Sequence, residues 1–100
     1  MSGWTLESTD PPLVLRLPPG SVKTIGRTAR ADFIVEAALV SRLHCRLTTS
    51  ESDVLVVEDL DSTNGTLVNG VRVTRAELKP GDALTVGRVH FTVGTGLFST

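Results

Sequence analysis

The chain has 100 residues, of which 40% are hydrophobic, 21% charged and 4% aromatic, and its formal net charge is -1. This length and apolar content suit one domain with a single core, whereas the balanced charge and the few aromatic residues argue against nucleic-acid or membrane binding. Cys45 is the single cysteine, so neither an internal disulfide nor a cysteine-based zinc site is expected. We expect an intracellular protein, because the sequence carries no signal peptide and no membrane-spanning run.

Short apolar runs rich in valine, leucine and threonine recur along the chain, each bounded by Gly, Pro, Asn, Asp or Ser. None of them is long enough, with helical spacing, to indicate an amphipathic helix. The runs predict an all-β fold, with strands near residues 4–6, 13–17, 22–25, 33–35, 43–48, 54–58, 66–68, 71–73, 83–86 and 89–93. Many short strands with frequent turns favour a β-sandwich over a parallel α/β sheet.

Two turn signals stand out in the second half of the chain. Asn69-Gly70 separates two β-rich triplets, which predicts a hairpin whose two central residues take positive φ. The Pro-Gly-Asp sequence at 80–82 marks a further turn. After the last strand, residues 94–100 show no pairing pattern. The domain is therefore assigned to residues 1–95, and residues 96–100 to a tail leading into a longer parent chain.

Three loops between predicted strands carry groups suited to binding a tetrahedral oxyanion. They contain Gly26-Arg27, Ser41-Arg42-Leu43-His44 and Asp61-Ser62-Thr63-Asn64-Gly65. Loops at one end of a sandwich lie together, so distant residues can converge on one ligand. Guanidinium groups offer paired donors to phosphate oxygens, and hydroxyl and backbone N–H groups fill the remaining directions. The residues alone predict a local oxyanion site and leave the identity of the anion open.

The order of these motifs resembles that of the forkhead-associated (FHA) domain family. The family pattern is Gly-Arg, then Ser-x-x-His, then Ser-x-Asn-Gly and a second Asn-Gly, and it is matched here at residues 26–27, 41–44, 62–65 and 69–70. The resemblance covers nearly the whole chain. It implies an eleven-stranded, antiparallel-rich β-sandwich of the FHA/SMAD type. No cofactor is expected, and the spacing of residues around His44 and His90 does not suggest a metal site. The resemblance also implies a phosphothreonine-dependent module that recruits phosphorylated proteins in intracellular signalling.

The same resemblance assigns roles to individual positions of this sequence. It implies that the phosphate is bound by Arg27, Ser41, Arg42 and Thr63. Asn64 is implied to bind the peptide backbone. Leu39 falls where the family sets its preference for the third residue after the phosphothreonine, and an apolar side chain there favours an apolar or undemanding neighbour. The positions implied to support the loops without touching the ligand are Gly26, His44, Gly65, Asn69 and Gly70.

The residues also allow plainer structural interpretations. Taken alone, Arg27 can pair with a surface carboxylate such as Asp32 or Asp61. Ser41 and Thr63 can likewise be ordinary turn hydroxyls that bond to nearby backbone groups. Only the combined pattern of the loops favours phosphate binding over these interpretations.

Two other functions compete with phosphopeptide binding. Ser41 and His44, with either Asp59 or Asp61, can be drawn as a hydrolase triad, but the close spacing of Ser41 and His44 and the lack of a Gly-x-Ser-x-Gly elbow disfavour an enzyme. A phosphate-independent scaffold or dimerisation β-sandwich is the stronger alternative. We expect a monomer, with a dimer left open. A eukaryotic source would favour the nucleus and DNA damage signalling, and any other source the cytoplasm.

Overall fold

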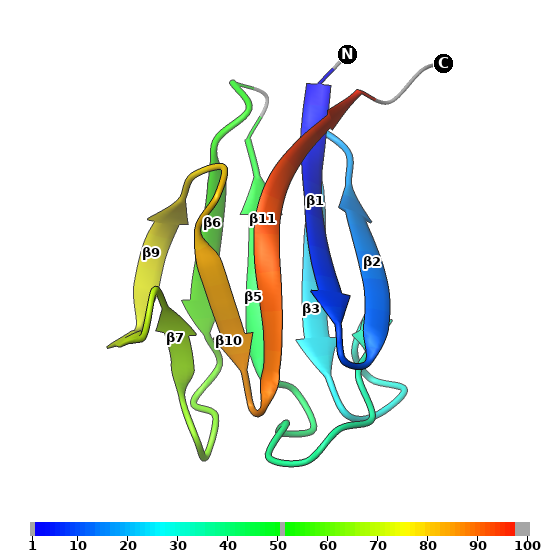
Figure 1. The fold of residues 1–100 in the computed structure, drawn as a ribbon, viewed down its shortest axis with the longest axis vertical. Coiled ribbons are helices and arrows are strands. Elements are labelled where there is room, and N and C mark those ends of the chain that lie inside the picture. Colours follow the sequence, from blue (N-terminus) through cyan, green and yellow to red (C-terminus); the bar gives the residue numbers. More distant parts are fainter. Residues whose placement is uncertain (1, 51, 98–100) are drawn as a thin grey trace.

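The chain folds into two β-sheets packed face to face in a computed structural model that describes residues 2–50 and 52–97 (Figure 1). The described residues form strands and turns, and the strands in chain order are β1 (Ser2–Thr9), β2 (Pro12–Leu17), β3 (Val22–Gly26), β4 (Phe33–Ile34), β5 (Cys45–Thr49), β6 (Leu55–Asp59), β7 (Thr66–Val68), β8 (Val71–Val73), β9 (Arg75–Leu78), β10 (Ala83–Val86) and β11 (Val89–Leu97). None of these residues forms a helix that is long and apolar enough to cross a membrane.

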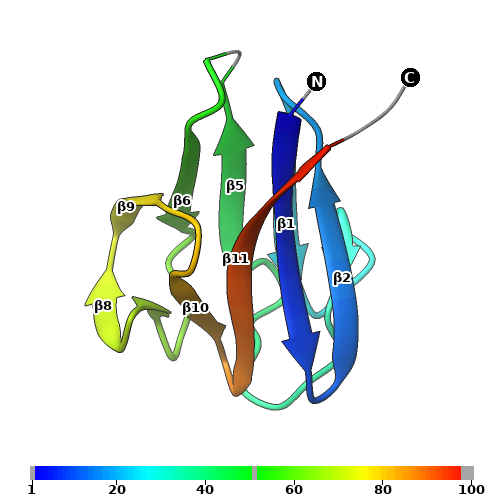
Figure 2. The same ribbon diagram turned by 45° about the horizontal axis from the view of Figure 1, so that its top comes forward.

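The two sheets differ in size and are almost entirely antiparallel. One sheet has six strands in the order β2-β1-β11-β10-β7-β8, and the other has five in the order β4-β3-β5-β6-β9. The short pair β3–β4 is parallel, and every other pairing between the described strands is antiparallel. Figure 2 shows β1, β2 and β11 side by side in the larger sheet. This architecture confirms the predicted all-β, antiparallel-rich sandwich.

The core lies between the sheets and follows the two-residue period of the strands. In β5, Cys45, Leu47 and Thr49 face inward, while the residues between them are partly exposed. The larger sheet contributes side chains such as Leu6 and Phe91, which are almost fully buried. Alternating side chains on the two inner faces interdigitate in this way in most sandwiches. Burial also raises the pKa of the Cys45 thiol to about 12, so the side chain acts as a small apolar filler.

Strand β9 was not predicted from the residue pattern. Its sequence, Arg75-Ala76-Glu77-Leu78, lacks β-branched and aromatic residues, yet it pairs with β6 at the edge of the smaller sheet. Leu78 is buried and Ala76 is partly buried, whereas the two charged residues are exposed. Charged side chains are common on edge strands because they oppose association between sheets. Pairing with a neighbour, rather than intrinsic propensity, therefore creates this strand.

The last strand also runs further than the sequence predicts. β11 pairs with β1 as far as Leu97 opposite Ser2, and Gly96 lies opposite Gly3. Residues 96 and 97, which were assigned to a tail, thus belong to the sheet, because β1 supplies backbone partners that the side-chain pattern does not reveal. Residues 98–100 lie outside the described part of the chain. The first and last described residues leave the sandwich side by side (Figure 1).

The predicted hairpin turn at Asn69-Gly70 is present between β7 and β8. Both residues have positive φ, 51° and 81°, as a two-residue hairpin turn requires. The Asn69 side chain accepts a hydrogen bond from the backbone N–H of Ala83 at 2.9 Å and donates one to Asp82 at 3.0 Å. Asn69 therefore joins its own turn to the β9–β10 turn, which carries the predicted Pro-Gly-Asp sequence.

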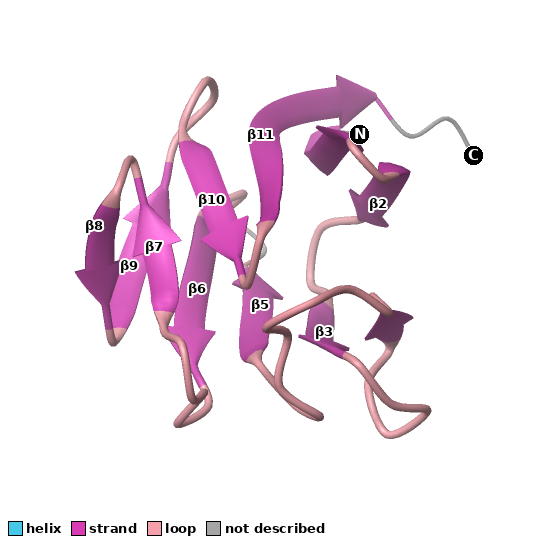
Figure 3. Ribbon diagram, turned by 60° about the horizontal axis from the view of Figure 1, so that its bottom comes forward, coloured by secondary structure: helices cyan, strands magenta, loops and turns pink. Residues whose placement is uncertain are grey.

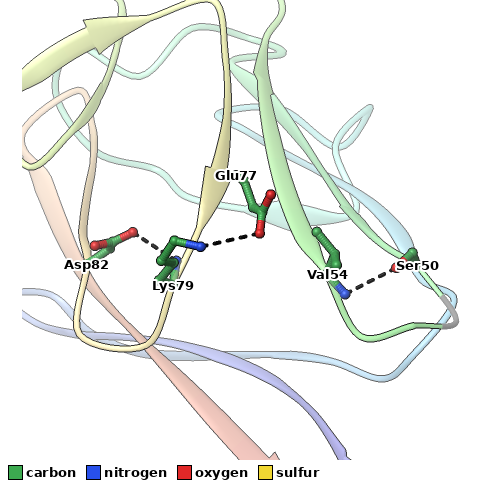
Figure 4. A network of polar contacts seen from close by, with 5 residues as sticks. All are labelled: Ser50, Val54, Glu77, Lys79 and Asp82. Carbon is green, nitrogen blue, oxygen red and sulfur yellow. Dashed lines mark hydrogen bonds and ion pairs between the residues drawn. The ribbon is translucent and has the colours of Figure 1, made fainter.

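Short-range polar contacts also stabilise the β9–β10 turn and the β5–β6 turn (Figure 4). The Asp82 carboxylate accepts the backbone N–H of Lys79 at 2.8 Å, and Lys79 Nζ lies 3.4 Å from Glu77 Oε1. In the β5–β6 turn, Ser50 Oγ accepts the backbone N–H of Val54 at 3.1 Å. Asp82 and Ser50 therefore provide partners for the backbone N–H groups of Lys79 and Val54.

Candidate functional site

The three polar loops identified in the sequence meet at one end of the sandwich. The ends of β3 and β6 and the starts of β5 and β7 lie at the bottom of Figure 1, and Figure 3 turns this end forward. Ser41 is the point of contact between the loops. Its carbonyl oxygen accepts the Arg27 N–H at 2.9 Å, and its hydroxyl oxygen accepts the Thr63 N–H at 3.1 Å. The structure thus brings together residues 27, 41 and 63, as expected for loops that share one ligand.

Gly26 allows the first two loops to approach closely. It ends β3 and is buried, and a Cβ atom at this position would lie 2.1 Å from the carbonyl oxygen of Arg42. No other residue fits there without displacing the backbone of the next loop. The absence of a side chain at Gly26 therefore allows the backbones of residues 26 and 42 to be in contact. Arg27 and Arg42, which are both exposed, thus belong to adjacent segments of the backbone.

Neither of these two arginines is neutralised by an acidic neighbour. Among residues 2–50 and 52–97, the ion pairs join Arg46 to Glu58 and Lys79 to Glu77. Asp32, one of two carboxylates considered as an alternative partner of Arg27, instead accepts the backbone N–H of Thr24 at 2.9 Å. This hydrogen bond lowers the pKa of the Asp32 carboxyl. The guanidinium groups at the loop end thus remain available to an external anion.

His44 ties the second loop to the third. Its imidazole is fully buried, accepts the Ser41 N–H on Nδ1 at 3.1 Å and bonds through Nε2 to the carbonyl oxygen of Gly65 at 2.8 Å. The Ser41 N–H can only donate and the Gly65 carbonyl can only accept, so the ring is the neutral tautomer with its proton on Nε2. Both ring nitrogens are therefore engaged in holding the loops.

This arrangement excludes the hydrolase triad considered from the sequence. A catalytic histidine must accept the proton of the serine hydroxyl. In His44 the nitrogen that can accept, Nδ1, is occupied by the Ser41 backbone N–H, and the Ser41 hydroxyl oxygen instead accepts a bond from Thr63. No cluster of three or more His, Cys, Asp or Glu side chains that could hold a metal occurs within the described residues.

A second polar network shapes the third loop. Its role in supporting the candidate site was not predicted from the sequence. Asp59 accepts hydrogen bonds from the hydroxyls of Ser62 and Thr66 and from the Ser62 N–H, and Ser62 Oγ accepts the Gly65 N–H at 3.0 Å. Burial by itself would raise the pKa of Asp59, but these hydrogen bonds outweigh it and lower the pKa. Ser62 stood in the family pattern, but only Asp59 as its partner explains its role.

Asn64 and Leu39 are brought together at the rim of the site. The Asn64 amide donates to the Leu39 carbonyl oxygen at 3.2 Å. Leu39 itself has φ of 68°, a left-handed conformation that is uncommon for residues other than glycine, and the residue is 47% exposed. The strained backbone presents the apolar side chain to solvent beside the amide. The remaining amide hydrogen and the oxygen of Asn64 are directed at no described partner.

Two of the residues assigned to loop support lie elsewhere. Asn69 and Gly70 form the β7–β8 turn, and the side-chain hydrogen bonds of Asn69 run to Asp82 of the β9–β10 turn and to Ala83, the first residue of β10. Gly65, by contrast, is the last residue of the third loop, has φ of 87° and is bonded through its carbonyl oxygen to His44. The described residues enclose no pocket. The candidate site is accordingly an open surface of hydrogen-bond donors and positive charge at the loop end.

Comparisons with known proteins agree with this fold. The FHA domain model matches residues 23–87. The ABC transporter ATP-binding/permease protein Rv1747 of Mycobacterium tuberculosis is 39% identical over 80 residues, which make up 80% of this chain and 9% of the transporter. A chain solved in a structural and functional analysis of phosphothreonine-dependent FHA domain interactions is 31% identical, with a TM-score of 0.84 over 96% of this chain and 99% of that one. The FhaA FHA domain, complexed with the intracellular domain of Rv3910, is 30% identical, with a TM-score of 0.78 over 93% of this chain and 99% of that one.

The sandwich and its donor-rich loops define a β-sheet interaction module. The chain belongs to the FHA domain family, whose members are interaction modules rather than enzymes. It spans 13% or less of the length of the curated relatives it matches.

Proposed function

We propose that this FHA domain binds phosphothreonine-containing segments of partner proteins and recruits those proteins in intracellular signalling. The observation that carries the proposal is the arrangement around Ser41. Its hydroxyl oxygen is fixed by the Thr63 N–H at 3.1 Å, while its hydroxyl hydrogen has no acceptor among the described residues. That hydrogen can be donated to a phosphate oxygen, and the charges of Arg27 and Arg42 lie on adjoining loop positions.

These donors explain why binding would depend on phosphorylation. A phosphate group brings about two negative charges and several strong acceptor oxygens, and each hydrogen bond to a charged group contributes about 1.5–3 kcal/mol. Ordering a flexible peptide offsets much of this gain. We expect dissociation constants on the order of micromolar or somewhat tighter. The unmodified threonine offers nothing to the arginines, so its binding should be undetectable at the same concentrations.

The rim residues would bind the rest of the peptide. Asn64 keeps a carbonyl oxygen and one amide hydrogen for the peptide backbone after donating to Leu39. The exposed Leu39 side chain is suited to an apolar or undemanding residue three positions after the phosphothreonine. Thr63, which the family resemblance assigns to the phosphate, lies next to Asn64 and donates its N–H to the Ser41 hydroxyl oxygen. These roles extend the proposal from the phosphate to the sequence around it.

A direct test is titration of a phosphothreonine peptide library against the purified domain, with the same library unphosphorylated and in its phosphoserine form. We expect saturable binding of the phosphothreonine library only. The expected preference over phosphoserine follows from the family resemblance. Equal binding of phosphorylated and unphosphorylated peptides would refute it and support a phosphate-independent scaffold. Sedimentation of the same samples tests the expected monomer.

The wider biological setting is part of the proposal. The relatives that share this domain include a transporter and a protein kinase, and the chain covers a small share of each. We infer that the domain serves as the recruiting part of a larger protein. A nuclear site of action and a role in DNA damage signalling remain predictions for a eukaryotic source, and the cytoplasm for any other.

A further inference from the structure

Arg72 carries a positive charge that the proposed phosphate site does not use. It lies in the middle of β8, is exposed, and forms no ion pair within the described ranges. Its side chain folds over Gly65: a Cβ atom at position 65 would lie 2.7 Å from Arg72 Nε and 3.0 Å from its Cδ and Cζ atoms. The bare backbone of Gly65 therefore lets the guanidinium lie directly against the third loop.

This contact places the charge beside the peptide-binding rim. Gly65 directly follows Asn64 in the sequence. Given the length of one Cα–Cα step, about 3.8 Å, the Arg72 Cζ atom lies within about 8 Å of the Asn64 Cα atom. An extended peptide advances about 3.3 Å per residue. If one residue of a peptide is bound at Asn64, the residue about one to three positions beyond it, on the side toward β8, therefore lies within reach of Arg72.

Arg72 is also separate from the arginines assigned to the phosphothreonine. Arg27 and Arg42 belong to loops flanking the smaller sheet, whereas β8 is an edge strand of the larger sheet, where Arg72 lies opposite Leu67. Asp61, the acidic residue of the third loop, forms no ion pair with Arg72 in the described structure. The charge of Arg72 is therefore uncompensated from within the domain.

We propose that Arg72 selects partners that carry a second anionic side chain close to the phosphothreonine, on the side of the peptide that runs past Asn64 toward β8. The inference rests on the proposed function, because it requires a peptide lying across Asn64. A guanidinium pairs through its planar fork with either a carboxylate or a phosphate. Because the pair would be exposed, we expect about two- to fivefold tighter binding, weakening as salt is added. A second phosphate, with about twice the charge, should gain more than a carboxylate.

The test is a set of phosphothreonine peptides in which each flanking position is in turn Ala, Asp, Glu, phosphoserine or Lys. These are titrated against the wild-type domain, Arg72→Ala, Arg72→Glu and the matched control Arg16→Ala, an exposed arginine of β2 that lies opposite Thr5. The wild type should prefer an anion at one position within reach of Arg72. Arg72→Ala should remove that preference and bind the all-Ala peptide within about twofold of wild type. Arg72→Glu should reverse the preference toward Lys, and Arg16→Ala should leave it intact.

The outcomes separate the two proposals. If phosphothreonine peptides bind but the wild type shows no anion preference, or Arg72→Ala retains it, the role of Arg72 is overturned while the proposed function stands. If no phosphothreonine peptide binds better than its unphosphorylated form, both fail. The Asp, Glu and phosphoserine arms tell a carboxylate from a second phosphate. Should Arg72→Ala lower the melting temperature, Arg72→Gln, which keeps most of the side chain over Gly65, replaces it.

Discussion

His44 and Gly65, separated by 21 residues in the sequence, are joined by a 2.8 Å hydrogen bond between the imidazole Nε2 and the glycine carbonyl oxygen. The same ring accepts the Ser41 N–H on its other nitrogen. One buried side chain therefore sets the distance between the loop that carries Ser41 and the loop that carries Asn64. The geometry of the candidate site depends on a residue that does not belong to its surface.

Replacing His44 with Ala should disturb both stability and binding. The change leaves the Ser41 N–H and the Gly65 carbonyl without their partners in a buried position, and each such group costs about 1–3 kcal/mol. We expect the free energy of unfolding to fall by about 2–4 kcal/mol in urea titrations, with weaker phosphopeptide binding in the fraction that remains folded. The control is His90→Ala, which removes an exposed ring with a single bond to Thr85. Equal losses in the two variants would contradict the bridging role.

Asp59→Asn should destabilise the domain by about 1–3 kcal/mol at neutral pH, because the amide replaces one of two acceptor oxygens with a donor. Either Oδ2, which accepts the Ser62 N–H, or Oδ1, which accepts the hydroxyls of Ser62 and Thr66, is lost. Asp61→Asn is the matched control: Asp61 is exposed, and its φ of 60° is one that asparagine tolerates. Thermal melts of both variants beside the wild type would measure the difference. A loss as large in Asp61→Asn would mean that any charge change in this loop is harmful.

The Asp59 network also predicts a dependence of stability on pH. The pKa of Asp59 is lower in the folded protein than its ordinary value of 3.8. The carboxylate therefore contributes stability that is fully present above that value and is lost as the pH falls through the folded pKa. The difference in unfolding free energy between wild type and Asp59→Asn should be constant from neutral pH to about pH 5 and shrink at lower pH. A difference that grew on acidification would have the wrong sign.

Gly26→Ala should be more damaging than an alanine at a glycine with positive φ. The added methyl group would lie 2.1 Å from the Arg42 carbonyl oxygen, so the backbone must move, at a cost of about 1–3 kcal/mol or more. At Gly20, which has φ of 76° and open space around it, alanine should cost about 1 kcal/mol. Denaturant unfolding compares the two. If Gly20→Ala were the worse variant, the close approach to the Arg42 carbonyl oxygen would not be the reason why position 26 requires glycine.

Arg27→Ala should weaken phosphothreonine-peptide binding by at least about tenfold, because a charge-assisted hydrogen bond contributes about 1.5–3 kcal/mol. The melting temperature should change little, since the Arg27 side chain is exposed and forms no ion pair in the described part of the chain. Isothermal titration with one phosphopeptide measures the effect, with Arg16→Ala as the control for loss of positive charge. A tenfold loss in both variants would point to the overall charge and not to this position.

The sequence predicted the sandwich because most strands combine β-branched or leucine-rich runs with clear turn signals. β9 escaped notice because Arg75-Ala76-Glu77-Leu78 reads equally well as helix or loop, and only its pairing with β6 makes it a strand. The extension of β11 through Gly94 and Gly96 depends in the same way on β1 as a partner. Strand pairing is a property of two segments, so a single segment does not reveal it.

For the site, the sequence identified the residues at the surface and missed part of what positions them. Arg27, Ser41, Thr63 and Asn64 stood out because arginine, hydroxyl and amide groups in loops suit an anion. Asp59 was considered only as a candidate member of a hydrolase triad, because its role as an acceptor for Ser62 and Thr66 depends on the path of the loop. Arg72 was passed over for the same reason, because its proximity to Gly65 follows from the hairpin.

The pairing of Ser2 with Leu97 has a consequence for how the domain can be mounted. Both ends of the described chain emerge together at the pole opposite the Arg27 and Ser41 loops (Figure 1). The domain can therefore be inserted between two segments of a host protein, or tethered to a solid support through either end, without screening the loops. An array of such domains on a biosensor surface would present every proposed recognition face outward.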